Sequence, residues 1–173
     1  MNRLRLIVVA LTLLGIPAGV GAQDKDQPNI VVDVAKGVLL DPTTYAPAII
    51  TWQATRLDWR SSQVFFRNGY TEQNPNFTLS GRSNDVAIGY ADGNHQILID
   101  ALANLQVSLV NNISTRVVEH VLVPRYPNHR KLVRTLGWIE RSLVASYLTY
   151  QMSSIHFQQW RDNEQRAVAL GLR

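Results

Sequence analysis

The chain contains no cysteine among its 173 residues. This absence excludes disulfide scaffolds, cysteine-ligated zinc and iron–sulfur sites, haem attached through a C-x-x-C-H motif and cysteine nucleophiles. Aromatic residues make up only 8% of the chain and charged residues 17%, whereas hydrophobic residues reach 46%. Because that hydrophobic content is too high for a wholly disordered or collagen-like chain, the composition predicts one ordinary folded domain, or at most two small ones.

Motifs that carry specific chemistry are missing as well. No G-x-S-x-G, no GxGxxG and no Gly-rich phosphate loop occurs, which removes the usual signatures of serine hydrolases and nucleotide-binding enzymes. The histidines form no H-E-x-x-H or H-x-H pattern, and no two lie four residues apart on one helix: His95, His120, His129 and His156. We therefore expect no metal site and no cofactor, and we assign no catalytic residue.

Residues 1–22 have the three-part pattern of a secretory signal peptide. Arg3 and Arg5 form a positive start, a short apolar run follows, and the segment ends in small residues. The pattern predicts cleavage after Ala22. Because the uncharged run is about as long as a minimal membrane helix, an uncleaved membrane anchor is the alternative.

The positive charge of the precursor lies partly in this leader. Without Arg3 and Arg5 the chain keeps 15 Lys and Arg against 13 Asp and Glu, a net charge of only +2. A genome-scale nucleic-acid binder would keep a basic patch after export, so we expect no nucleic-acid partner. The sequence predicts an exported protein, periplasmic or secreted, with membrane association as an option.

Hydrophobic periodicity divides the mature chain into a flexible N-terminal arm, residues 23–43, and a helical domain, residues 44–173. Within this domain, apolar residues recur every three or four positions in three segments, which predicts three principal helices near residues 44–68, 94–123 and 129–169. The expected fold is all-α: a three-helix up-down bundle with long helices and one long ordered loop.

The segment between the first two helices, residues 69–93, is rich in Asn, Gly, Ser and Asp and is the expected loop. The second helix has an apolar stripe: Leu98, Leu102, Leu105, Leu109, Ile113 and Val117. It also has a polar stripe: Asp100, Asn104, Ser108, Asn111, Asn112, Thr115 and Glu119. We expect apolar side chains to form the core, in particular Trp52, Trp59, Leu105, Leu109, Leu136, Trp138, Leu143 and Tyr147.

Two polar segments, Leu57–Gln63 and Gly69–Pro75, contain the carboxylates Asp58 and Glu72. A charge within an apolar stretch is costly unless it is paired. In one interpretation the two carboxylates act as acid and base of a small hydrolase. In the other, which we favour, Asp58 pairs with an arginine of another helix, while Glu72 and Asn74 accept hydrogen bonds from loop amides. The candidate polar cluster therefore contains the following residues: Asp58, Glu72, Asn74, Arg116, Arg134 and Arg141.

The order D-x-x-S-S/T followed by G-x-x-E-x-N-P, over Leu57–Pro75, resembles that of small uncharacterised bacterial helical proteins, exported or embedded in membranes. The similar segment covers about a tenth of the chain. The resemblance implies a bacterial helical module of unassigned activity, so it transfers no catalytic residue. This chain departs from the membrane members through its leader and its charged second and third helices.

Membrane insertion is the alternative to a soluble bundle. Residues 142–160 contain no Asp, Glu, Lys or Arg and are long enough to span a bilayer, but many of them are Ser, Tyr, Thr and Gln. Asp100 and Arg116 of the second helix would be expensive in lipid unless compensated. We therefore favour a soluble exported bundle. A two-span hairpin with the basic turn in the cytoplasm satisfies the positive-inside rule and stays open.

That basic turn, residues 125–134, contains no acidic residue. We interpret it as a solvated turn, with weak contact to anionic lipid as the alternative, through Arg125, Arg130 and Lys131. These features favour a non-catalytic structural or partner-binding module of the bacterial cell envelope, with an unknown protein or membrane-surface partner. The alternatives are a small hydrolase that uses Asp58 and Glu72, and a membrane-embedded helical hairpin protein.

Overall fold

The computed structural model describes residues 29–172, so the predicted signal peptide, residues 1–22, lies outside the described residues. The all-α class is confirmed: residues 29–172 contain helices and no strand. The four α-helices are α2 (Ile30–Leu39), α3 (Ala46–Arg67), α4 (Tyr90–Arg125) and α5 (Arg130–Ala169). Three short 3-10 helices connect them: η1 (Pro42–Thr44), η2 (Pro75–Phe77) and η3 (Pro127–His129).

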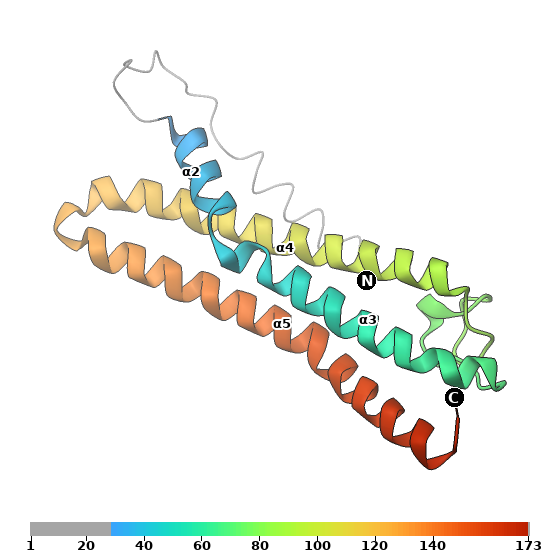
Figure 1. Ribbon diagram of the computed structural model, residues 1–173. Coiled ribbons are helices and arrows are strands. Elements are labelled where there is room, and N and C mark those ends of the chain that lie inside the picture. The colour runs from blue at the N-terminus through green and yellow to red at the C-terminus, as the bar shows by residue number, and fades with distance from the viewer. Residues whose placement is uncertain (1–28, 173) are drawn as a thin grey trace.

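α4 and α5 form a long antiparallel hairpin, and α3 lies along both of them (Figure 1). With 36 and 40 residues, these two helices extend roughly 54 and 60 Å, because an α-helix rises about 1.5 Å per residue. Pro124 lies in the last turn of α4, and the helix ends one residue later at Arg125. We term residues 125–130, which join the two helices, the hairpin tip.

α2 departs from the predicted elements. The flexible arm expected over residues 23–43 contains this helix, whose N-cap Asn29 accepts a hydrogen bond from the Val31 amide. Asp41 then caps η1, and α3 begins at Ala46. α2, η1 and α3 form a broken helical path beside the α4–α5 hairpin (Figure 1), which gives four α-helices in the described residues instead of the three principal helices expected.

The faces of the long helices are reversed relative to expectation. The polar stripe of α4 is turned inward, with Asn112 1% and Ser108 2% exposed, whereas Leu98 and Leu102 of its apolar stripe are exposed. Of the eight expected core residues, Trp59 is buried and three are half-buried: Trp52, Leu105 and Leu109. The prediction is wrong for the four on α5, which are exposed: Leu136, Trp138, Leu143 and Tyr147. Periodicity identifies two faces of a helix, but it does not say which face meets the neighbouring helices.

A small hydrophobic core lies where the loop, residues 68–89, packs against the helices. It consists of Trp59, Phe77 and Ile97, and the ring centroids of Trp59 and Phe77 are 5.1 Å apart. The Trp59 indole lies against Gly93, where a Cβ atom would overlap the ring. Two antiparallel bridges close the loop on itself: Glu72 with Asp85, and Thr78 with Ala87. The loop is therefore ordered, as expected.

Candidate functional site

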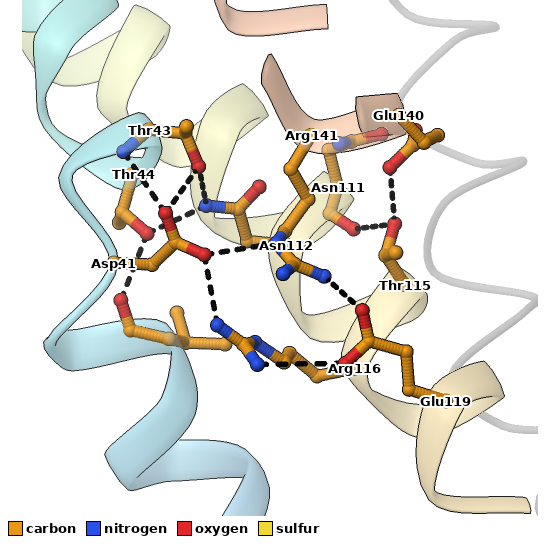
Figure 2. A network of polar contacts seen from close by, with 11 residues as sticks. Asp41, Thr43, Thr44, Asn111, Asn112, Thr115, Arg116, Glu119, Glu140 and Arg141 are labelled. Carbon is orange, nitrogen blue, oxygen red and sulfur yellow. Dashed lines mark hydrogen bonds and ion pairs between the residues drawn. The ribbon is translucent and has the colours of Figure 1, made fainter. Parts of the chain in front are cut away.

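The first polar site lies inside the bundle, in the part nearer the hairpin tip, where the break between α2 and α3 meets the α4–α5 hairpin. Figure 2 shows its contacts. Asp41 Oδ2 accepts hydrogen bonds from Arg141 Nε at 2.8 Å and from Arg116 Nη2 at 2.9 Å. Glu119 accepts from the same arginines, at 2.5 Å from Arg141 Nη1 and 3.4 Å from Arg116 Nη1. We term these four residues, together with Asn112, the polar core cluster. Its two cations are matched by two anions.

Asn112 ties the helix break to this cluster. Its side-chain amide donates hydrogen bonds to Thr43 Oγ1 at 2.9 Å and to Thr44 Oγ1 at 2.7 Å. The Thr44 hydroxyl in turn donates to the Val38 carbonyl at the end of α2, at 2.8 Å. Polar groups freed by the break therefore find partners inside the bundle.

The Asp41 carboxylate also accepts hydrogen bonds from Thr43. Its Oδ1 accepts one from the Thr43 amide at 3.1 Å and one from the Thr43 hydroxyl at 2.7 Å. Because Arg141 is only 2% exposed, its guanidinium depends on this carboxylate and on Glu119 for compensation.

Gly137 allows α4 and α5 to approach each other closely beside the polar core cluster. A Cβ atom at this position would overlap the carboxylate of Glu119. The absence of a side chain on α5 therefore provides the space in which the buried Glu119 reaches Arg141.

The second polar site is a cavity of about 680 Å³ at the opposite end of the hairpin from the tip, which we term the terminal cleft. Asp58 of α3 and His156 of α5 line it, and Asp58 Oδ2 lies 2.8 Å from His156 Nδ1. The Asn163 side-chain amide lies 3.4 Å from Asp58 Oδ1 and also contacts the hydroxyls of Ser61 and Ser62 at 3.1 and 3.0 Å. Aromatic residues form much of the remaining wall: Trp59, Phe65, Phe66, Tyr70 and Phe77.

Glu72 faces the same cleft from the loop. Its Oε1 accepts a hydrogen bond from the Asn74 amide at 2.7 Å, and Asn74 Oδ1 accepts one from the Asn76 amide at 3.1 Å. The expected role of Glu72 and Asn74 as acceptors for loop amides is therefore confirmed. Burial raises the pKa of Glu72, and the charge of Asp58 adds to that rise, whereas the amide hydrogen bonds oppose it.

The predicted pairing of Asp58 with an arginine is wrong. Asp58 pairs with His156, and the arginine lock forms around Asp41 instead. The structure thus divides the candidate polar cluster. Asp58, Glu72 and Asn74 line the terminal cleft, whereas Arg116 and Arg141 belong to the polar core cluster; Arg134 is exposed near the hairpin tip and lines a separate cavity of about 520 Å³.

Sequence reasoning did not assign five residues to these sites: Asp41, Asn112, Glu119, His156 and Asn163. The Asp-Pro pair at Asp41 indicates a helix start, and the carboxylate does accept a hydrogen bond from the Thr43 amide. Its arginine partners, however, lie 75 and 100 residues away. His156 has no partner within a helical turn, because Asp58 is 98 residues distant. No local pattern marks contacts at such separations.

Outside these sites the exposed surface of α4 and α5 is uncharged between its ends, and it combines large apolar side chains with Ser, Thr and Gln. No Asp, Glu, Lys or Arg is exposed between Asp92 and Arg125 on α4, or between Arg134 and Arg161 on α5. The charged residues within these stretches are at least half-buried: Asp100, Arg116, Glu119, Glu140 and Arg141. Large apolar side chains take their place, with Leu143 65% and Trp138 58% exposed. Within residues 29–172, α4 is the one helix that is long and apolar enough to cross a membrane, by length and composition.

Within the described part of the chain, no three His, Asp or Glu side chains form a group that could hold a metal ion. The polar core cluster contains paired ions, and the terminal cleft contains an imidazole and two carboxyl groups. Comparison of the chain with protein-family models, with curated proteins and with solved structures finds no match.

Proposed function

We propose that this chain is a helical module of the bacterial envelope that is inserted in a membrane through the outer faces of α3, α4 and α5. One observation carries the proposal: between the ends of α4 and α5 no charged side chain is exposed, whereas many large apolar side chains are. Exposed apolar side chains that gather on one part of a molecule mark a site of contact with a partner or a membrane. In a bilayer the same arrangement is expected, because lipid-facing positions are apolar and ionisable residues face the interior of the bundle.

The dimensions of the uncharged surface support insertion. From Ile97 to Val121, α4 extends roughly 36 Å, and the hydrocarbon core of a bilayer is about 30 Å thick. The first part of α3, residues 46–55, is also free of charge. Exposed cations bound this band at both ends: Arg56 and Arg60 near the terminal cleft, and Arg125, Arg130, Lys131 and Arg134 at or near the hairpin tip.

α2 has two exposed charges, Asp33 and Lys36. Asp33 lines a cavity with Pro124 and Arg134, so it lies at the tip end of the bundle. The long side chain of Lys36 can extend along the helix toward the same interface. Neither charge therefore requires a place at the centre of the bilayer.

The objection to insertion was the cost of placing polar residues in lipid. Arg116 is paired within the polar core cluster, and Asp100 accepts a hydrogen bond from Gln96 at 3.0 Å. The helix break near Asp41 has its own partners in Asn112 and Thr44. Insertion requires internal partners for backbone and charged groups, and these contacts supply many of them. Four buried side-chain atoms have no hydrogen-bond partner among the described residues: Thr51 Oγ1, Asn104 Nδ2, Asn111 Nδ2 and Arg116 Nε.

The absence of cysteine allows a direct test, because single cysteines can be introduced without background labelling. We would place them in the apolar band, in Val107→Cys and Leu143→Cys, with Arg67→Cys and Arg161→Cys as matched exposed controls. In membranes from an expressing host, a hydrophilic maleimide should label the controls and should label the band only after denaturation. The parent chain should stay in the membrane pellet after a carbonate wash.

Two outcomes would contradict insertion. In the first, the chain is recovered in the soluble fraction and its band cysteines are labelled at the control rate. The apolar band then faces water and is covered neither by lipid nor by protein. A soluble chain whose band cysteines are protected has that face covered by protein, which would replace the membrane by a partner or a second copy.

The same variants decide the orientation, for which two expectations conflict. The α2 residues Asp33 and Val34 lie beside Val123 and Pro124 of α4, so the described N-terminus and the hairpin tip are at the same end. A cleaved leader then puts the tip on the exported side, whereas the positive-inside rule puts it in the cytoplasm. Labelling of Arg130→Cys against Asn68→Cys in intact cells distinguishes the two.

A hydrolase is the second candidate function. Asp58 and Glu72 line the same cavity, which is the arrangement that two cooperating carboxyl groups require. Loss of turnover in both Asp58→Asn and Glu72→Gln, with folding retained, would support it. Absence of turnover in the parent chain would reject it.

A further inference from the structure

The terminal cleft combines polar groups from three separate segments. Asp58 comes from α3, Glu72 from the loop and His156 from α5, and all three line the same cavity. The side chains of Asp58 and His156 are 15% and 23% exposed, so their contact borders the cavity and is not sealed within the bundle. A contact that only joined two helices would not need an opening of about 680 Å³ beside it.

His156 is held in one orientation by Asp58. The contact between Nδ1 and Asp58 Oδ2 is 2.8 Å long, and an ionised carboxylate can only accept, so Nδ1 carries the hydrogen. The other ring nitrogen, Nε2, is then a free acceptor in the neutral imidazole. Among the described residues, Nδ1 is the one ring nitrogen of His156 that has a hydrogen-bond partner.

Asp58 is itself held in place. Asn163 approaches its second oxygen, Oδ1, at 3.4 Å, and the same amide contacts the hydroxyls of Ser61 and Ser62. The Ser61 hydroxyl donates to the Asp58 carbonyl at 2.8 Å. The imidazole, the carboxylate and the amide thus form a chain of contacts that orients the base.

Four charged or titratable groups surround the imidazole. Asp58 touches it, Glu72 and Arg166 line the same cavity, and Asp100 of α4 interacts with its charge. Burial and the Asp58 charge raise the pKa of Glu72. A carboxyl group and an oriented imidazole in one cavity are the two kinds of group that acid–base catalysis uses.

We infer that the terminal cleft hydrolyses carboxylic esters with an apolar group, with His156 as general base, Glu72 as general acid and Asp58 as the residue that positions His156. This inference rests on the hydrolase candidate and gives the role of base to the histidine. The exposed side chains of Tyr70 and Ile155 on the cleft wall suit the apolar group of the ester, and a cavity of this size suits a small molecule.

The reaction is a hydrolysis that needs no other reactant than water. His156 Nε2 removes a proton from water as the water oxygen bonds to the acyl carbon. Arg166, the cation on the cleft wall, stabilises the negative charge on the carbonyl oxygen. The bond between the acyl carbon and the alkoxy oxygen then breaks, and Glu72 protonates that oxygen. The products are a carboxylic acid and an alcohol, and the His156 proton returns to Glu72 through solvent.

The test uses the full-length chain and two chromogenic probes, 4-nitrophenyl acetate and 4-nitrophenyl hexanoate. His156→Gln is compared with His129→Gln, a matched control whose exposed side chain lies at the hairpin tip. We expect kcat/KM to fall about 100-fold or more in His156→Gln and to stay at the parent value in His129→Gln. The hexanoate should be the better substrate, because its chain occupies the apolar wall.

The pH profile gives a readout that a purely structural role would not produce. The rate should rise with pH in the parent chain, and His156→Gln should remove that rise. Glu72→Gln keeps the oxygen that accepts from the Asn74 amide. It should slow an alkyl ester such as ethyl hexanoate, whose alkoxide needs a proton to leave, more than the 4-nitrophenyl esters, whose nitrophenolate leaves without one. Asp58→Asn should lower kcat more than it raises KM, because it misorients the base.

Two results would overturn the inference. If His156→Gln keeps the parent rate while Asp58→Asn and Glu72→Gln lose it, the carboxylates act without the histidine, and the hydrolase candidate survives. If the folded parent chain is no faster than His156→Gln at any pH with either ester, the inference is wrong. Hydrolysis of other substrate classes then decides the hydrolase candidate separately.

Discussion

Two polar sites join α5 to α3 or to the turn before it. The polar core cluster is largely closed off from solvent, whereas the terminal cleft is open to it. In the polar core cluster two arginines are matched by two carboxylates, and Arg141 is almost completely buried. In the terminal cleft the carboxylates Asp58 and Glu72 face a histidine and an open cavity. A balanced, closed set of charges is suited to holding helices together, whereas an open set leaves groups available to a ligand.

The two sites should respond differently to the removal of one polar residue. Removing one member of a closed ionic cluster leaves a buried charge without compensation, so its effect falls on stability. Removing a member of the terminal cleft exposes the remaining groups to water, so stability changes less. Stability measurements on matched variants of the two sites therefore test this distinction.

The largest effect is expected for Asp41→Asn. The substitution leaves two cations, Arg116 and Arg141, facing one carboxylate, and we expect the free energy of unfolding to fall by about 3–5 kcal/mol. Chemical denaturation of the purified protein, followed by far-ultraviolet circular dichroism, measures it. Asp33→Asn, on the exposed face of α2, is the control. An Asp41→Asn variant as stable as this control would show that the cluster does not support the fold.

Gly93→Ala tests the apolar contact beside the terminal cleft. The added methyl group overlaps the Trp59 indole, and overpacking of this kind costs about 1–3 kcal/mol. In a double-mutant cycle, Trp59→Phe should cancel part of the cost, because the smaller ring leaves room. If the changes in unfolding free energy of Gly93→Ala and Trp59→Phe simply add, α3 and α4 accommodate the methyl group without overpacking against Trp59.

Asp58→Asn should destabilise the fold less than Asp41→Asn. It weakens one hydrogen-bonded pair with a partly exposed histidine, and we expect a loss of about 1–2 kcal/mol. Asp162→Asn, on the exposed face of α5, serves as the control in the same denaturation experiment. A loss equal to that of Asp41→Asn would remove the distinction between the closed and the open site.

The smallest effect is a dependence of stability on pH. Because the pKa of Glu72 is raised by burial from its ordinary value of 4.5, the folded state binds this proton more tightly than the unfolded state does. Its contribution to stability is complete below that ordinary value and is lost as pH rises through the folded pKa.

Melting temperatures of the parent chain and of Glu72→Gln, measured from below pH 4.5 upward, check the sign for Glu72. The neutral glutamine should remove the loss on the alkaline side, so the variant gains relative to the parent as pH rises. A difference between the two proteins that shrinks with rising pH would contradict the direction of the Glu72 shift.

The helices were predictable because their signals are local. Periodic apolar residues predict α3, α4 and α5, and Asn68-Gly69 ends α3 where the glycine adopts a φ of +83°. The roles of Glu72 and Asn74 were also predictable, because each accepts from an amide two residues away. Contacts of this kind depend on neighbours in the chain, which the sequence contains directly.

The sequence by itself determined that this protein is helical, where its long helices run and that each has a polar and an apolar face. Only the tertiary structure decided which face is inside. An amphipathic pattern has the same period whether its apolar face meets a core or a surrounding apolar phase. The direction depends on whether polar groups from distant segments satisfy one another. Asp41 reaches Arg141 100 residues away, and Asn112 reaches Thr44. Once these contacts fill the interior, Leu143 and Trp138 face outward.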